Sequence, residues 1–159
     1  MSNSIAAPQA TLRRAVHGDL EAVERLLVAS SLPVIGVAEA LPTFVVAESE
    51  GRIVGVVGLE ICNEYALLRS TAVEPEWRDR GLGRRLVERI IAEAEAQGIC
   101  ALYLLTTTAE RYFPSFGFAK TTREAVPAPV RETAEFQSAC PASATVMCLT
   151  LPAAAPTRA

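Results

Sequence analysis

The stretch Arg78-Asp79-Arg80-Gly81-Leu82-Gly83-Arg84-Arg85 decides the fold of this chain. An apolar run ending in Ala72-Val73-Glu74-Pro75 precedes it and an amphipathic segment follows it, which predicts the order strand, glycine turn, helix. The first N–H groups of a helix have no intrahelical acceptor, and the helix dipole makes that end favourable for an anion. The stretch therefore predicts a phosphate-binding turn.

Gly81 and Gly83 suit such a turn because glycine adopts positive φ and lets a pyrophosphate approach the main chain. Four arginines share the turn: Arg78, Arg80, Arg84 and Arg85. Their permanently charged, planar side chains match phosphate oxygens. Lys120 is the only lysine, so general surface basicity does not explain the cluster. The alternative is a solvated arginine face on an ordinary helix.

The pattern lacks the third glycine of a Rossmann fingerprint and the Gly-Lys-Ser/Thr end of a Walker loop. It resembles the acetyl-CoA signature of the GNAT N-acetyltransferases, Arg/Gln-x-x-Gly-x-Gly/Ala. Val73-Glu74-Pro75-Glu76-Trp77 stands where that family has its Val-x-Pro-x-aromatic lead-in. The resemblance implies acetyl-CoA as co-substrate, with the main chain of Ala72 and Val73 along its pantetheine arm and thioester. The pyrophosphate would be held by Arg78, Arg80, Gly81, Leu82, Gly83 and Arg84.

Composition agrees with a single domain over residues 1–159, with its core at about 11–151. Half of the 159 residues are hydrophobic, enough for a substantial core. A net charge of −3 argues against nucleic acid as a partner, and no apolar stretch is long enough to span a membrane. We expect a cytosolic protein. The cysteines, Cys62, Cys100, Cys140 and Cys148, lack Cys-x-x-Cys spacing and predict free thiols and no metal site, although Cys140 and Cys148 could in principle bind arsenic.

Periodicity and turn signals predict alternating elements. Strands are expected at Ala10–Ala15, Phe44–Glu48, Arg52–Glu60, Ala66–Val73, Cys100–Leu105, from Gly117-Phe118 onward, and at Ala144–Leu151. Helices are expected after Asp19 as N-cap, from the glycine turn to Gly98, after a capping box at Thr107-x-x-Glu110, and briefly around Val130–Phe136.

This order, β-α-β-β-β-α-β-α-β-β, is similar to that of the GNAT fold. The resemblance implies an α/β (α+β) protein with a central mixed, mostly antiparallel sheet of about seven strands, flanked by helices. In the family the fourth and fifth strands splay apart, and the pantetheine of acetyl-CoA lies in the gap.

The resemblance also directs attention to a general acid and a general base. Many GNAT enzymes have a tyrosine four residues before the glycine of a Gly-Phe pair, which protonates the departing CoA thiolate. Counting back from Gly117 gives Phe113 at that position. Tyr112, next to it, is the candidate acid if the short helix is rotated; the alternative is a packing tyrosine. Glu60 is the candidate base, with Glu64 as an alternative.

Two resemblances concern the acetyl acceptor. The segment from Leu105 to Phe113 is similar to the Leu-Thr-Thr-Arg-Thr segment of N-acetylglutamate synthases but has Thr108 where they have arginine. The runs at 66–70, 103–108 and 140–144 resemble arsenic-resistance-associated GNAT proteins, a group related to enzymes that acetylate glutamate-mimicking toxins. If the acceptor carries a carboxylate, the candidate ligands are Arg69, Arg131, Thr106 and Thr107.

The sequence thus predicts an acetyl-CoA-dependent N-acetyltransferase acting on a small, amino-acid-like amine, in a role that includes arsenic or toxin resistance. A protein N-acetyltransferase and a CoA-binding regulatory module without catalysis are the alternatives. Dimers are common in the family, so a homodimer stays open.

Overall fold

The computed structural model describes residues 9–139 and 143–152, so Cys140 lies outside them. One sheet of seven strands has the order β1-β2-β3-β4-β5-β7-β6. The strands are β1 (Thr11–Arg14), β2 (Val45–Ser49), β3 (Arg52–Cys62), β4 (Tyr65–Val73), β5 (Ala101–Thr106), β6 (Ala119–Thr121) and β7 (Thr145–Thr150). All neighbours pair antiparallel except β4 and β5, which are parallel. The predicted mixed sheet is confirmed.

A two-residue hairpin turn joins β2 and β3, which pair antiparallel. Glu50 and Gly51 both have positive φ, 52° and 79°, as the tightest right-twisting hairpin turns require. Glycine adopts this conformation without a steric penalty, so Gly51 is what lets the two strands reverse within two residues.

The sheet opens between β4 and β5. Only three residue pairs join these strands, from Tyr65 with Ala101 to Leu67 with Tyr103. The rest of β4, up to Val73, has no strand partner on that edge, because β5 turns away to pair along its whole length with β7. This is the splay that the family resemblance implied, and it leaves unpaired main-chain groups beside the glycine turn.

A β-bulge distorts β4 within this unpaired stretch. The register between β3 and β4 shifts between Val56 and Gly58, and Ser70 has a φ of 62°. A non-glycine residue with such a φ is held there by its surroundings at a cost of about 1–3 kcal/mol, and such residues cluster at functional sites. The strand prediction for Ala66–Val73 did not include this bulge.

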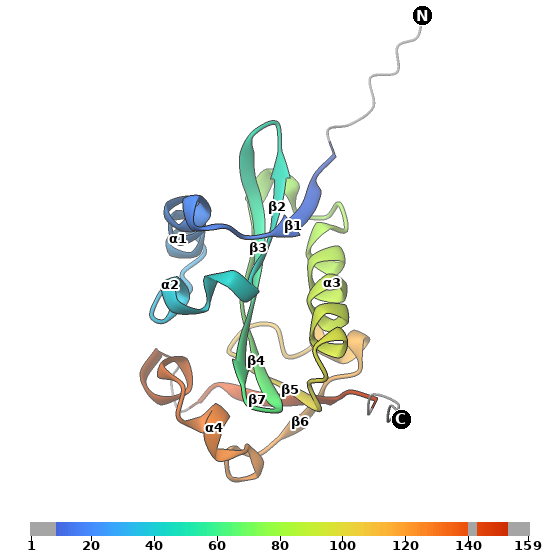
Figure 1. Cartoon of the computed structure of the whole chain (residues 1–159). Helices are drawn as coiled ribbons and strands as arrows, with labels where there is room; N and C mark the ends of the chain where they lie inside the picture. The colour runs from blue at the N-terminus through green and yellow to red at the C-terminus, as the bar shows by residue number, and fades with distance from the viewer. Residues whose placement is uncertain (1–8, 140–142, 153–159) are drawn as a thin grey trace, which may run out of the picture.

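Helices cover both faces of the sheet (Figure 1). One face carries α1 (Leu20–Ala29), α2 (Val37–Ala40), α4 (Ala128–Arg131) and a π-helical turn η6 (Glu135–Ala139). The other carries α3 (Leu82–Ala96), whose buried stripe includes Leu86, Val87 and Ile90. Short 3-10 turns are η1 (His17–Asp19), η2 (Leu41–Thr43), η3 (Pro75–Trp77), η4 (Phe113–Phe116) and η5 (Arg123–Ala125). No helix of the described residues is both long and apolar enough to cross a bilayer.

Two helix predictions are wrong in detail. The capping box at Thr107 and Glu110 does not form: Thr106 Oγ1 accepts the N–H groups of Thr108 and Ala109, while Glu110 accepts from the hydroxyl of Thr145. The expected α-helix is replaced by η4. The predicted helix at Val130–Phe136 is split into α4 and η6, since the chain turns between them at Thr133.

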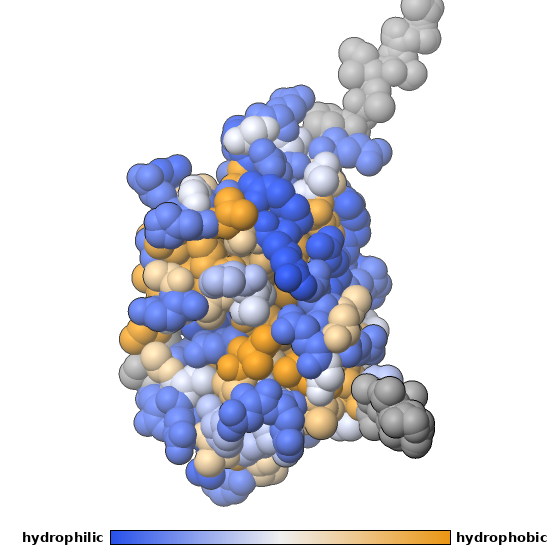
Figure 2. Space-filling view, viewed as in Figure 1, coloured by the Kyte–Doolittle hydropathy of each residue, from blue (hydrophilic) through white to orange (hydrophobic). Residues whose placement is uncertain are grey.

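Asp19 stands at the N-cap position of α1 but makes no side-chain capping bond there. Its carboxylate instead receives Arg13 Nη1 and Nη2 at 2.8 and 3.0 Å and the Val16 N–H at 2.8 Å. Strongly hydrophilic residues gather over β1 in Figure 2, and β1 contributes Arg13 and Arg14. The predicted cap is thus an ion pair that ties α1 to the sheet edge.

Replacing Asp19 by Asn is expected to lower the free energy of unfolding by about 2 kcal/mol at pH 7, because a buried charged hydrogen-bond partner is lost. Arg13 holds the pKa of Asp19 below its usual value, against the opposing effect of burial. The contribution of this carboxylate is therefore present above about pH 4 and is lost as the pH falls through its folded-state pKa. Urea unfolding at pH 7 and pH 3 checks this, with Glu21→Gln as a control. If Asp19→Asn lowered the free energy of unfolding equally at both pH values, this prediction would be contradicted.

Candidate active site

The glycine turn begins α3 as expected. Gly81, the residue before the helix, has a φ of 80°, and Asp79 also lies in the left-handed region with a φ of 64°. The first intrahelical bond runs from the Arg85 N–H to the Gly81 carbonyl at 3.1 Å. The N–H groups of Leu82, Gly83 and Arg84 precede it and point out of the helix end, where they can bind a phosphate.

A pocket of about 320 Å³ opens at this helix end. It is lined by Val73, Trp77, Arg78, Asp79, Gly81, Leu82, Gly83, Arg84 and Tyr112. Six of the eight predicted cofactor residues are among them. A larger pocket, of about 590 Å³, lies between α1 and the β2–β3 hairpin, but it contains neither the helix N-terminus nor the splayed edge of β4. The smaller pocket is therefore the candidate site for the chemistry expected of the glycine turn.

The other two predicted cofactor residues lie beside this pocket. The Arg80 guanidinium stacks on Trp77, 5.0 Å from the ring centroid, and Ala72 is buried in β4 opposite Val56. Arg80 is exposed and Ala72 can offer only main-chain groups.

The remaining arginines of the turn have different orientations. Arg78 Nε donates to the Val73 carbonyl at 3.1 Å, and Arg84 Nη2 donates to Ser115 Oγ at 2.8 Å while lying over the Phe116 ring. Arg85 is bonded to the Ala10 carbonyl and does not line the pocket. Arg78 and Arg84 are therefore the two cations that flank the helix N-terminus.

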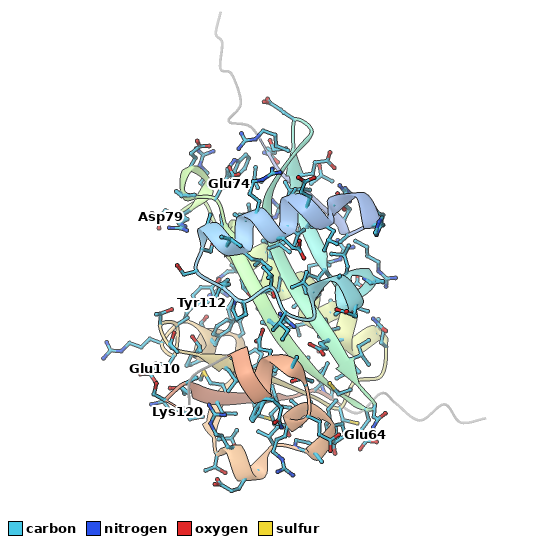
Figure 3. All side chains as sticks on the ribbon, turned by 90° about the vertical axis from the view of Figure 1, so that its left-hand side faces the viewer. Glu64, Glu74, Asp79, Glu110, Tyr112 and Lys120 are labelled. Carbon is cyan, nitrogen blue, oxygen red and sulfur yellow. The ribbon has the colours of Figure 1, made fainter. Side chains whose placement is uncertain are left out.

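Tyr112 lies on the pocket wall. A Cβ atom added to Gly83 would be 3.3 Å from the Tyr112 hydroxyl, so this hydroxyl lies over the first turn of α3. Figure 3 shows Tyr112 between Asp79 and Glu110 along one edge of the molecule. Burial raises the pKa of Tyr112, and the nearby Arg84 opposes this rise. Phe113, at the family's tyrosine position, is buried and packs against Phe118 at 5.6 Å. Tyr112 is therefore a phenol that stays protonated near neutral pH beside the candidate cofactor pocket.

Glu60 and Arg69 form an ion pair on the opposite face of the sheet, at 3.1 Å. The Arg69 side chain is fully buried, while that of Glu60 is 24% exposed. A second carboxylate, Glu135, also contacts Arg69 at 3.1 Å, and the Ile35 carbonyl accepts from Arg69 at 2.7 Å. A substrate carboxylate could reach this guanidinium only by displacing one of these partners. The alternative base, Glu64, lies at the β3–β4 turn, far from Tyr112 (Figure 3).

The other predicted acceptor residues lie in two places. Thr106 ends β5, and its hydroxyl is used to cap the following turn, whereas Thr107 is exposed. Arg131 is exposed at the end of α4, where its Nε donates to the Val126 carbonyl at 2.8 Å. Arg131 is thus the acceptor-side cation with an exposed side chain, unlike Arg69.

Sequence reasoning missed two features of this site. Ser70 and Thr71 form the bulge of β4, and Thr71 Oγ1 is buried without a hydrogen-bond partner among the described residues. The polar run Arg69-Ser70-Thr71 within an apolar strand was the available signal. Glu135 belongs to a segment whose sequence pattern predicts only a brief helix, so nothing pointed to its contact with a strand 66 positions earlier.

Comparisons with known proteins agree with this geometry. The family model of the GNAT acetyltransferase domain matches residues 40–120. An amino-acid acetyltransferase of Pseudomonas fluorescens is 40% identical over 87 residues, which cover 54% of this chain and 20% of the relative. The chain thus matches only about a fifth of the length of that relative.

Two solved structures are similar over almost the whole chain. Rv2747 from Mycobacterium tuberculosis, in complex with CoA and NLQ, has a TM-score of 0.76 and 24% identity over 89% of this chain and 99% of that protein. N-acetylglutamate synthase from Neisseria gonorrhoeae, in complex with coenzyme A and N-acetyl-glutamate, has a TM-score of 0.77 and 22% identity over 90% of this chain and 35% of the synthase. These likenesses establish the fold.

A splayed mixed sheet with a helix N-terminus suited to an anion at the splay is the architecture expected of a CoA-dependent acyltransferase. The family match makes this specific: the chain belongs to the GNAT N-acetyltransferase family, whose enzymes use acetyl-CoA as co-substrate.

Proposed function

We propose that this chain transfers the acetyl group of acetyl-CoA to the amine of a small, amino-acid-like molecule. The observation that carries the proposal is the pocket where the N-terminus of α3, the unpaired edge of β4 and the Tyr112 hydroxyl meet. The pyrophosphate would bind the N–H groups of residues 82–84, flanked by Arg78 and Arg84. The exposed Arg80 would add positive charge beside the pocket. The pantetheine arm would run along Ala72 and Val73 in the splay.

The reaction would be a direct attack of the amine nitrogen on the thioester carbonyl carbon. A main-chain N–H of the distorted β4 edge, at or near Val73, would stabilise the oxyanion. Glu60 would take the proton that the amine loses, directly or through water, and Tyr112 would donate a proton to the CoA sulfur as the C–S bond breaks. Binding both substrates in line would supply much of the remaining acceleration.

The amino-acid-like acceptor is supported by the matching acetyltransferase relatives and by the resemblance of Leu105-Thr106-Thr107 to N-acetylglutamate synthases. Since Arg69 already has two carboxylate partners, the exposed Arg131 is the better candidate for a substrate carboxylate, with Thr107 beside the end of β5. A role in arsenic or toxin resistance, a cytosolic location, the single-domain organisation and a homodimer stay predictions.

The test of this proposal measures CoA release from acetyl-CoA with a free-thiol reagent, using a panel of amines as acceptors. The acceptors are glutamate, phosphinothricin, arsinothricin, polyamines and basic peptides, and a protein-only blank corrects for acetyl-CoA hydrolysis. We expect turnover with at least one amino acid or glutamate mimic. Turnover with peptides alone would favour a protein N-acetyltransferase, and tight acetyl-CoA binding without any turnover would favour a regulatory module.

A further inference from the structure

Arg69 joins four parts of the chain at one buried point. Its Nη1 contacts Glu60 of β3, its Nη2 donates to Ile35 in the α1–α2 connection, and its Nε is shared between Ser70 of the bulge and Glu135 of η6. Glu135 is itself only 4% exposed. Each nitrogen of a fully buried guanidinium therefore has a partner, and the partners come from segments far apart in sequence.

Two of these segments, the α1–α2 connection and η6, lie on the face of the sheet opposite the pocket at the N-terminus of α3 (Figure 1). Val73 and Gly83 line that pocket on the α3 side of β4, whereas Arg69 points to the face covered by α1, α2 and α4 (Figure 1). In a direct transfer the amine must approach the thioester from the side that the cofactor does not occupy. The acceptor would therefore enter between the α1–α2 connection, with the exposed Ile35, and the α4–η6 segment (128–139) that contains Glu135.

The contact between Glu135 and Arg69 depends on the negative charge of the Glu135 carboxylate. Burial raises the pKa of Glu135 and Arg69 lowers it, so the carboxylate is a costly buried group whose main compensation is Arg69. An uncharged amide at this position would lose the ionic attraction and keep only a weaker hydrogen bond. The α4–η6 segment would then be less firmly held against β4.

We propose that Glu135 is a positioning residue for the acetyl acceptor, acting through Arg69 to hold the α4–η6 segment as one wall of the acceptor site. The inference rests on the proposed function. It adds a residue that touches neither acetyl-CoA nor the reacting atoms. Because Arg69 also contacts Glu60, the same ion pairs orient the proposed base.

The test compares Glu135→Gln with Glu135→Asp and with Glu132→Gln, an acid-to-amide change at an exposed residue of the same segment. For Glu135→Gln we expect the KM of the best acceptor to rise roughly tenfold, while the Kd of acetyl-CoA measured without acceptor stays within about twofold. Glu135→Asp, which keeps the charge, should recover part of this loss. Glu132→Gln should behave as wild type.

Hydrogen exchange provides a readout that does not depend on turnover. Amides of residues 128–137 should exchange faster in Glu135→Gln than in wild type, while those at the start of α3 should not change. Equal acceptor KM values for Glu135→Gln and wild type would overturn the inference, and so would an equal loss of acetyl-CoA binding. Absence of wild-type turnover with every amine would instead refute the proposed function, and unchanged exchange in Glu135→Gln would then also reject the positioning role.

Discussion

Gly83→Val is expected to weaken acetyl-CoA binding by about 100-fold or more, equivalent to about 2.7 kcal/mol. Even a Cβ atom at this position would be 3.3 Å from the Tyr112 hydroxyl and 3.8 Å from Val73 Cγ2. A branched side chain would fill the pocket where the pyrophosphate must approach the N–H groups of α3. Calorimetric titration with acetyl-CoA measures the effect directly.

Gly18→Val is the matched control, because a Cβ at Gly18 would meet no heavy atom within 4 Å and the residue lies outside the cofactor pocket. We expect this variant to bind acetyl-CoA as wild type does. If Gly83→Val were folded, as judged by circular dichroism, and bound acetyl-CoA with wild-type affinity, the cofactor would have to bind elsewhere.

Tyr112→Phe is expected to lower kcat by roughly 100-fold while leaving the Kd of acetyl-CoA nearly unchanged, since general acid catalysis contributes about 10²–10⁴-fold. The ring would keep its edge-to-face contacts with Phe113 and Phe116, so only the hydroxyl is removed. Because the pKa of Tyr112 is raised by burial, the phenol stays protonated as the pH rises from 7 to 9. Over this range kcat should therefore show no loss from ionisation of the acid.

Tyr65→Phe provides the control for the loss of a phenol, because Tyr65 lies at the opposite end of β4 from Val73 and packs on Tyr103. Its kcat should equal that of wild type. If Tyr112→Phe kept full kcat at every pH, Tyr112 would be a packing residue, and the thiolate would be protonated or solvated by another route.

Much of the fold was predictable because its signals are local. The glycine turn, the hairpin at Gly51 and the helix end at Gly98 each depend on positive φ, which the sequence marks with glycine. The splay of β4 from β5 followed from the family resemblance. The predicted helix caps at Asp19 and Thr107 are wrong because each depended on which hydrogen-bond partner the side chain would find. Asp19 binds Arg13 instead of the helix N-terminus, and Thr106 caps the turn in place of its neighbour Thr107.

The site was predictable where it depends on the main chain and less so where side chains cross the sheet. Gly81 and Gly83 are where the motif placed them. Arg69, a candidate ligand for a substrate carboxylate, instead contacts the carboxylates of Glu60 and Glu135. Side-chain direction in β4 changes at the Ser70 bulge, and no periodicity marks a bulge in advance. The Glu135 contact depends on tertiary packing alone.

The most direct test of the central claim is the stoichiometry of acetyl transfer. Wild-type protein, acetyl-CoA and the best amine of the panel are mixed, and free CoA thiol and N-acetylated amine are quantified together over time. The account predicts that both products appear at the same rate, one to one, and that the rate falls sharply in Gly83→Val and Tyr112→Phe. CoA release without acetylated amine, or acetyl-CoA binding with neither product, would contradict it.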